Sequence, residues 1–240
     1  MAIKSGETTY HQAKRGIVQN GLVLNLAAGV DASYNGGTTW RDLAGSNDGS
    51  LVNMNNANLT KDNGGVFTFG GTNEYVQIDQ DVSDNDTRTL TGWVNMESAG
   101  VTLISCCRVS GSSTSQTKIS TEFNSDGDLV AIVQDHSGIA VATCAANLNV
   151  WLHVTAVFTR SYPNWTADLY LNGSLQSTDS GSSTSSLGIN QTLVGLTKRQ
   201  NGAEIGFADG KISNTSIYSR ALTATEITQN YNVTRHRFGV

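Results

Sequence analysis

The feature that most constrains the fold of this chain is a series of short apolar segments with turn residues between them. Leu22, Leu24 and Leu26 alternate with Val23 and Asn25, as the residues of a half-buried strand do. Similar segments, separated by Gly, Asn, Asp or Ser, recur at 66–69, 75–78, 90–95, 101–105, 118–123 and 129–134. Such spacing of short strands is typical of a sandwich or barrel. We therefore expect an all-β fold.

The clearest strands lie in the second half of the chain. Residues 151–159 and 167–171 are rich in β-branched and aromatic side chains. The step Asn172-Gly173 tolerates positive φ, which favours a two-residue turn into a strand at 174–177. The remaining predicted segments are a flexible Gly/Ser loop at 180–186 and strands at 191–195 and 207–218.

One short helix is predicted near the C-terminus. Thr223 and Glu226 have the spacing of a capping box, in which each side chain bonds to the backbone N–H of the other residue. Ile227 and Tyr231, four residues apart, give this helix an apolar face that can lie against the strands.

The composition excludes several classes of partner. The formal net charge is −5 and no long basic run occurs, so the pattern of a nucleic-acid-binding protein is missing. No segment is apolar and long enough to span a bilayer, and the first residues lack the apolar stretch of a secretory signal. We therefore expect synthesis in a cytoplasm, with no nucleic acid partner and no membrane insertion. Cys106, Cys107 and Cys144 form no disulfide framework and are predicted to be reduced thiols.

The chain divides at about residue 20. Residues 1–19 are polar and show no period, whereas 20–240 are long enough for one β-sandwich domain with a full core. The first segment is predicted to be a disordered tail or an N-terminal arm that orders on a neighbouring molecule.

Six segments resemble a known family. They stand in the order seen in laminin-G-like members of the concanavalin A-like lectin/glucanase superfamily. They are Gly21-Leu-Val-Leu-Asn-Leu26, Thr38-Thr-Trp-Arg-Asp-Leu-Ala-Gly45, Phe69-Gly-Gly-Thr-Asn-Glu-Tyr-Val76, Trp151-Leu-His-Val154, Leu169-Tyr-Leu-Asn-Gly173 and Ile217-Tyr-Ser-Arg-Ala-Leu-Thr-Ala-Thr-Glu226. The resemblance implies a two-sheet antiparallel jelly-roll sandwich with one short C-terminal helix.

A narrower resemblance concerns the end of the chain. Residues 219–232, together with Arg237-Phe238-Gly239, resemble such domains in structural proteins of tailed bacteriophages. This resemblance implies a virion structural protein, as a capsid decoration or surface appendage. Its partners would be neighbouring capsid or tail subunits and further copies of itself on the particle, with a weak surface for a cell-surface glycan. A fold alone does not define a function, so a carbohydrate-binding lectin or adhesin and a glycoside hydrolase remain as alternatives.

The catalytic alternative lacks its residue pattern. Retaining glucanases of this superfamily carry a Glu-x-Asp-x-x-Glu spacing, because two carboxylates must flank one glycosidic bond. The glutamates of this chain are scattered, its four histidines form no metal-ligand pair, and no Gly-x-Ser-x-Gly occurs. We therefore expect a protein without enzymatic activity.

A calcium site is predicted at residues 42–49. Asp42, Asn47 and Asp48 offer carboxylate and amide oxygens, which are the ligands that calcium prefers. The alternative is that Asp42 caps a turn and that 47–49 only reverse the chain.

A carbohydrate- or partner-binding surface is predicted at the loop that contains Tyr162, Asn164 and Trp165. An exposed aromatic ring can stack on the apolar face of a sugar while neighbouring polar groups bond its hydroxyls. The same ring can contact a protein partner. Trp40, Trp93 and Trp151 are expected in the core.

Overall fold

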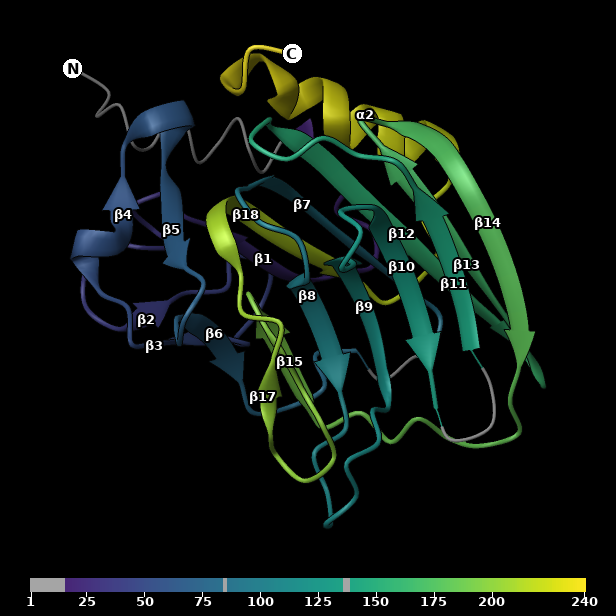
Figure 1. The fold of residues 1–240 in the computed structure, drawn as a ribbon. Helices are drawn as coiled ribbons and strands as arrows, with labels where there is room; N and C mark the ends of the chain where they lie inside the picture. The colour runs from purple at the N-terminus through teal and green to yellow at the C-terminus, as the bar shows by residue number, and fades with distance from the viewer. Residues whose placement is uncertain (1–15, 84–85, 136–138) are drawn as a thin grey trace.

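The computed structural model describes residues 16–83, 86–135 and 139–240 of the chain. Two antiparallel sheets pack face to face, and one helix, α2 (Ala224–Thr234), lies outside one of them (Figure 1). The prediction of an all-β sandwich with one short C-terminal helix is confirmed.

The first sheet, sheet I, has the strand order β14-β13-β12-β7-β18-β5-β4, and β1 also pairs with β18. Its strands are β1 (Leu22–Ala27), β4 (Leu59–Thr60), β5 (Val66–Gly70), β7 (Arg88–Met96), β12 (Leu152–Ser161), β13 (Asn164–Leu171), β14 (Ser174–Ser182) and β18 (Asp209–Tyr218).

The second sheet, sheet II, has the order β11-β10-β9-β8-β15-β6-β3-β2, and a separate hairpin pairs β16 with β17. Its strands are β2 (Thr39–Trp40), β3 (Gly49–Val52), β6 (Tyr75–Ile78), β8 (Val101–Cys107), β9 (Lys118–Phe123), β10 (Leu129–Gln134), β11 (Ile139–Cys144) and β15 (Gln191–Val194). The hairpin consists of β16 (Thr197–Lys198) and β17 (Glu204–Ile205). Three short 3-10 helices complete the described elements: η1 (Asn56–Asn58), η2 (Asp62–Gly64) and η3 (Arg235–Arg237).

The main core lies between the two sheets. Successive residues of a strand point to opposite faces, so alternate residues of each strand enter it. The ring of Phe67 contacts Trp40 and Tyr34 edge to face, with both ring centroids 4.8 Å away. Burying one large apolar side chain contributes roughly 1.5–3 kcal/mol, and the cluster in this core contains 38 buried residues, most of them large and apolar.

The outer face of sheet I is also buried, because α2 and the C-terminal residues cover it. Trp93 of β7 points outward into this cover and is fully buried, as Trp40 is in the main core; the prediction that both are core residues is confirmed. Thr223 caps α2, and its capping box with Glu226 is formed as predicted. Glu226 also pairs with Arg220, whose guanidinium nitrogens lie 2.8 and 2.6 Å from the two carboxylate oxygens.

The N-terminal residues that the structure describes pack on the same face. Val18 is buried against Tyr218 and Ile227. Residues 16–19 therefore contact this domain itself, because Val18 completes an apolar cluster. For these four residues the structure differs from the predicted disordered tail or arm that orders on a neighbouring molecule. Residues 1–15 of the predicted arm lie outside the described residues.

The two sheets meet along the edges formed by β11 and β14. Backbone N–H groups of β11 are bonded by side chains of β14: Val141 donates to Asp179 and Thr143 to Ser177. The flexible loop predicted from residue 180 is therefore wrong as far as Ser182. Ser180–Ser182 continue β14, because pairing with β13 fixes their extended backbone.

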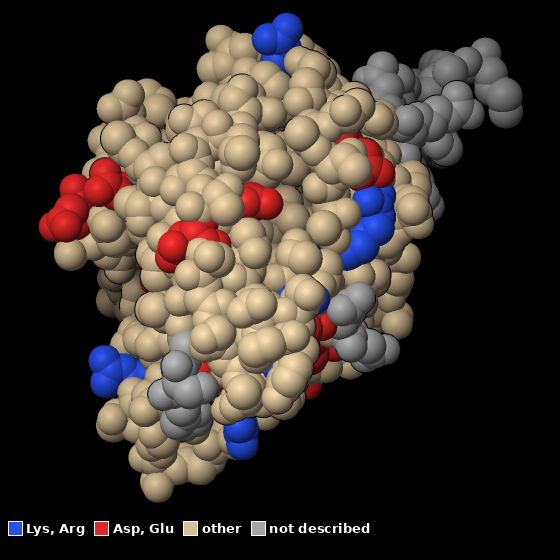
Figure 2. Space-filling model, turned by 90° about the vertical axis from the view of Figure 1, so that its right-hand side faces the viewer, with Lys and Arg blue, Asp and Glu red and all other residues tan. Residues whose placement is uncertain are grey.

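Charged side chains are few on the β14 side of the molecule. Figure 2 shows this face as largely uncharged, with isolated acidic and basic groups between wide areas of other residues. No contiguous basic surface is visible in this view.

Candidate ligand-binding hollow

A polar hollow of about 270 Å³ lies on sheet II, where β3 begins and the antiparallel β6 ends. We call it the rim hollow; its lining is Ser46, Asn47, Asp48, Ser50, Gln77, Ile78, Asp79 and Gln80. All of these residues except Ile78 carry a polar side chain. Carboxylate, amide and hydroxyl groups converge here, and such groups bind ligands rich in hydroxyls.

The predicted calcium loop forms one side of this hollow. Asp42 is buried and points into its own loop, where its Oδ1 accepts the N–H groups of Asn25 and Ala44, both at 2.8 Å. Its Oδ2 accepts the N–H of Asn47 at 3.2 Å, and its own N–H donates to Asp48 Oδ1 at 2.9 Å. Asp42 therefore organises the turn, which is the alternative role considered from the sequence.

The same bonds limit what this loop can offer to calcium. Three backbone N–H groups already occupy the Asp42 carboxylate, and Asn47 Oδ1 accepts from Gln80. Calcium takes six to eight oxygen ligands, so Asp42, Asn47 and Asp48 together fit it poorly. Within the described ranges, no three His, Cys, Asp or Glu side chains gather in a way that could hold a metal ion. Calcium binding remains a prediction.

The other side of the rim hollow is built by β6. Gln77 lies between the core residues Val76 and Ile78 and therefore points outward. Its Nε2 donates to Asp79 Oδ1 at 2.6 Å, and Gln191 of the neighbouring β15 donates to the same oxygen at 3.3 Å. Lys198 donates to Gln77 Oε1 at 2.7 Å. The orientation of Gln77 is thus fixed from both ends of its amide.

Lys198, which donates to Gln77, also contacts Tyr75 and Glu204. Its ammonium lies 5.1 Å from the ring centroid of Tyr75 and 3.4 Å from Glu204. Tyr75 donates its hydroxyl to Glu204 at 2.7 Å. Burial and this carboxylate raise the pKa of Tyr75 to about 12, so the phenol stays protonated near neutral pH.

The predicted aromatic surface at the β12–β13 turn is only partly formed. Tyr162 is 69% exposed and Asn164 is exposed, but Trp165 is only 2% exposed and lies in the main core. The expectation that Trp165 is an exposed binding residue is therefore wrong. Trp165 is the second residue of β13 and points inward, under the guanidinium of Arg160. Tyr162 and Asn164 remain candidates for contact with a ligand or partner.

Sequence reasoning missed Gln77, Asp79 and Gln80. The available signal was the group of polar residues Gln77, Asp79 and Gln80 at the end of a predicted strand. What the sequence did not reveal was that β3 and β6 pair, which brings this group beside Asn47 and Asp48.

Several acidic side chains are bonded to neighbouring residues within the fold. Glu122 accepts from Lys118 and Ser120, Glu204 from Tyr75, and Glu226 from Arg220. His153 is buried under α2, which lowers its pKa to about 3 and keeps the imidazole neutral. These groups stabilise the fold at the places where they lie.

The two packed sheets, the outer helix and a polar rim hollow define a lectin-like β-sandwich. The family model described as the concanavalin A-like lectin/glucanases superfamily, Laminin_G_3, matches residues 69–228, which is more than half of the chain. This protein belongs to that family. Comparison with curated proteins finds no match to the sequence.

Several solved structures share this fold. A mutant of Trypanosoma rangeli sialidase that displays trans-sialidase activity aligns with a TM-score of 0.65 at 17% identity, over 99% of this chain and 39% of the sialidase chain. The binding domain of botulinum neurotoxin DC in complex with rat synaptotagmin II aligns with a TM-score of 0.61 at 15% identity, over 90% of this chain and 52% of the toxin domain. The chain thus spans about two fifths to half of these proteins, and at such identity the likeness shows the fold alone.

In the part of the chain that the structure describes, no helix has the length and apolar character required to cross a bilayer.

Proposed function

We propose that this protein is a binding domain without catalytic activity and that it recognises a hydroxyl-rich ligand, such as a carbohydrate, through the rim hollow. The observation that carries this proposal is the convergence of amides, carboxylates and hydroxyls from β3, β6 and the 42–49 loop on one hollow. Because no aromatic ring lines it, stacking on a sugar is missing and we expect weak binding.

The charge of the hollow favours a neutral ligand. Asp48 and Asp79 both line it, and none of its lining residues is Lys or Arg. An acidic sugar would bring a third carboxylate close to these two without a cation to pair with it. We therefore propose neutral glycans in preference to sialylated ones.

A glycan array tests this proposal with matched variants. The wild-type protein should bind a set of neutral glycans, and Asp79→Asn and Gln77→Ala should reduce that binding at least about fivefold, since each removes a hydrogen bond of about 1 kcal/mol or more. Asp126→Asn, in an exposed turn, is the control and should bind like wild type. Equal binding by all variants, or a preference for sialylated glycans, would contradict the role of the hollow. Release of a shorter sugar product would contradict the absence of catalysis.

We further propose that the domain is displayed on a virion, as a capsid decoration or surface appendage. The support is the resemblance of residues 219–232 and Arg237-Phe238-Gly239 to phage structural proteins. In the fold, Arg220, Glu226 and Phe238 of these segments fasten α2 to sheet I. The likeness of these residues to phage structural proteins can therefore reflect a common fold as well as a common function. The proposed location on a virion requires its own test.

The geometry of sheet I is compatible with display. Thr228 of α2 bonds to Gly173 at one end of β13, and Tyr162 and Asn164 lie at the other end. Eight residues of extended strand separate the two ends by roughly 25 Å. A domain attached to its neighbours near α2 would thus present the Tyr162 turn away from them.

Quantitative mass spectrometry of purified virus particles from the source culture tests this location. Co-sedimentation with the major capsid protein in many copies is expected for a decoration protein. A few copies per particle would indicate a tail or fibre subunit, and absence from the particles would remove the virion role and leave the binding domain.

A further inference from the structure

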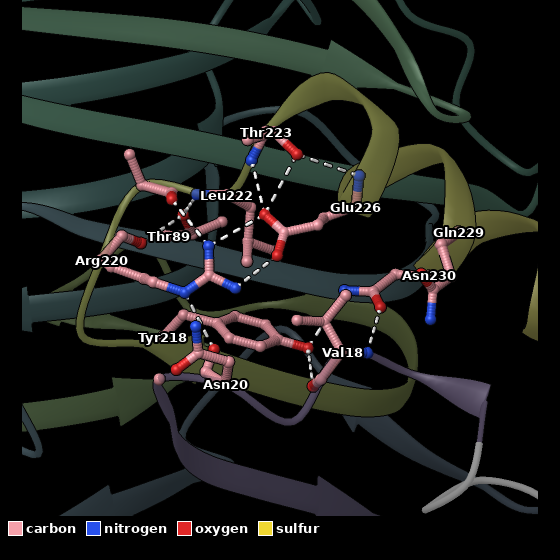
Figure 3. Close-up of polar contacts among 12 residues, drawn as sticks. Val18, Asn20, Thr89, Tyr218, Arg220, Leu222, Thr223, Glu226, Gln229 and Asn230 are labelled. Atoms are coloured by element: carbon pink, nitrogen blue, oxygen red, sulfur yellow. Dashed lines mark hydrogen bonds and ion pairs between the residues drawn. The ribbon is translucent and has the colours of Figure 1, made fainter.

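Side chains of β18, of α2 and of the loop between them form a groove that residues 16–20 occupy. Figure 3 shows Val18 and Asn20 of this segment beside Tyr218, Arg220 and Asn230. Val18 donates its N–H to Asn230 Oδ1 at 2.8 Å, and its carbonyl accepts from the Tyr218 hydroxyl at 3.0 Å. The carbonyl of Gly16 accepts from Gln229 at 3.0 Å, and that of Asn20 from Arg220 at 2.9 Å. Each of these bonds joins a side chain of the domain to a main-chain group of the segment.

The groove also restricts the residue type at two positions of the segment, Gly16 and Val18. Val18 is buried in an apolar cluster with Tyr218, Leu222 and Ile227. A Cβ atom on Gly16 would collide with Val233 of α2, so only glycine allows this close approach. Gln19 and Asn20 are exposed. The groove therefore fits a main chain with the pattern Gly-x-Val.

The side chains that form the groove also bond to one another. Asn230 Nδ2 donates to the Tyr218 hydroxyl at 3.0 Å, and Arg220 is fixed by its two bonds to Glu226. Figure 3 shows these contacts linking β18 to α2 beside the segment. We call this set, Tyr218, Arg220, Gln229 and Asn230 with the apolar Leu222 and Ile227, the segment groove.

A glycine separates the segment from the first strand. Gly21 has a φ of +76°, a conformation that glycine adopts without strain, and its carbonyl accepts from Ser219 at 2.8 Å. Beyond it, Leu22–Ala27 pair with β18. Because the backbone at Gly21 can change direction, the segment can leave the groove while β1 stays paired.

We propose that the segment groove is a peptide-binding site and that it accepts residues 16–20 of a second copy of this chain in exchange for its own. Every copy carries both the groove and the matching segment, so an exchanged pair makes the same contacts as an unexchanged one. Protein concentration and the backbone conformation at Gly21 decide between the two states. This inference is independent of the proposed glycan binding.

A labelled peptide of residues 14–20 tests the groove on the full chain. In Val18→Asp the chain's own segment loses its buried side chain, so its groove becomes available. Fluorescence anisotropy should show this variant binding the peptide at least about tenfold more tightly than wild type does. A peptide with Val18→Asp or Gly16→Leu should not bind. Failure of a folded Val18→Asp chain to bind the wild-type peptide, or equal binding of all three peptides, would overturn the proposal.

Two variants of the groove serve as controls for this binding. Asn230→Leu removes the acceptor of the Val18 N–H, and Val233→Phe places bulk where Gly16 approaches, so either change should abolish peptide binding in the Val18→Asp chain. Asn232→Leu, exposed on the same helix, should leave it unchanged. Circular dichroism and thermal unfolding show which variants are folded; Val233→Phe replaces Asn230→Leu if the latter does not fold.

Complementation between two full-length variants tests the second copy as occupant. Val18→Asp offers a free groove, and Val233→Phe offers a free segment, so a mixture should form a heterodimer in sedimentation velocity while each variant alone stays monomeric. Peptide binding without a heterodimer would restrict the groove to its own chain and would overturn the exchange.

Discussion

Trp93 and Phe238 stack with their ring centroids 4.1 Å apart and their planes 17° from parallel. Trp93 belongs to β7, whereas Phe238 lies beyond α2, close to the end of the chain. The ring centroid of Trp151 lies 4.7 Å from that of Phe238, and the Trp93 indole N–H donates to Thr234 at 2.7 Å. The C-terminal residues thus complete a second core on the outer face of sheet I.

Replacing Phe238 by alanine should therefore destabilise the whole domain. The change removes a ring that is 7% exposed and leaves a cavity beside Trp93, which should lower the free energy of unfolding by roughly 3 kcal/mol. Urea unfolding followed by tryptophan fluorescence measures this. Val240→Ala, at an exposed position two residues later, should cost less than about 0.5 kcal/mol. Equal effects of the two changes would contradict the second core.

Acid should destabilise the fold through His153. Burial lowers its pKa from 6.5 to about 3, so the folded state binds this proton less readily than the unfolded state. The stabilisation is complete above pH 6.5 and is lost as the pH falls from 6.5 towards 3, with a slope of at most about 1.4 kcal/mol per pH unit.

The His153→Phe variant isolates this contribution. Its free energy of unfolding should depend less on pH between 6 and 4 than that of wild type, because phenylalanine cannot be protonated. His236→Gln, at an exposed position, should retain the wild-type pH profile. An unchanged slope in His153→Phe would show that His153 is not the group that titrates.

Trp165 and Tyr162 should respond in opposite ways to truncation. Trp165→Ala removes a core side chain and should cost roughly 3–5 kcal/mol of stability. Tyr162→Ala removes an exposed ring and should change stability by less than about 0.5 kcal/mol. Thermal unfolding of both variants distinguishes the core residue from the surface residue, and a large loss for Tyr162→Ala would contradict the described burial.

The 42–49 loop should depend on Asp42 and not on calcium. Asp42→Ala leaves the buried N–H of Asn25 without its acceptor, and the loss of this and the neighbouring bonds should cost about 2–4 kcal/mol. Addition of EDTA to the wild-type protein should leave its melting temperature unchanged, since protein groups already bond the carboxylate. A drop in melting temperature with EDTA, restored by calcium, would show a metal site. Asp31→Ala, at an exposed position, is the control for the mutation.

Local sequence patterns predicted much of the fold. The strands at 75–78, 118–123 and 129–134 have the predicted bounds, because an Asp or Asn residue directly follows each of these segments. β11 was not predicted, and β14 extends further than expected. Ser, Thr and Gly dominate the end of β14, and only its pairing with β13 and contact with β11 fix its extended backbone.

The candidate site was less accessible to prediction. Asn47 and Asp48 were identified by residue type, yet Gln77 and Asp79 join them only through the pairing of β3 with β6, which a local pattern does not encode. Trp165 was misplaced because a residue beside a turn was expected to be exposed, whereas the strand continues through Asn164 and turns the indole inward. Which strands pair, and to which side of a sheet a side chain points, both depend on tertiary structure.

The measurement that tests the central claim most directly is an NMR titration of the isotope-labelled protein with a neutral oligosaccharide selected from the glycan array. If the rim hollow is the binding site, chemical-shift changes should concentrate at Asn47, Asp48, Gln77 and Asp79, and should disappear in Asp79→Asn, with the sugar recovered unchanged. Shift changes centred on Tyr162 and Asn164 with none at the hollow, or conversion of the sugar during the titration, would contradict the account.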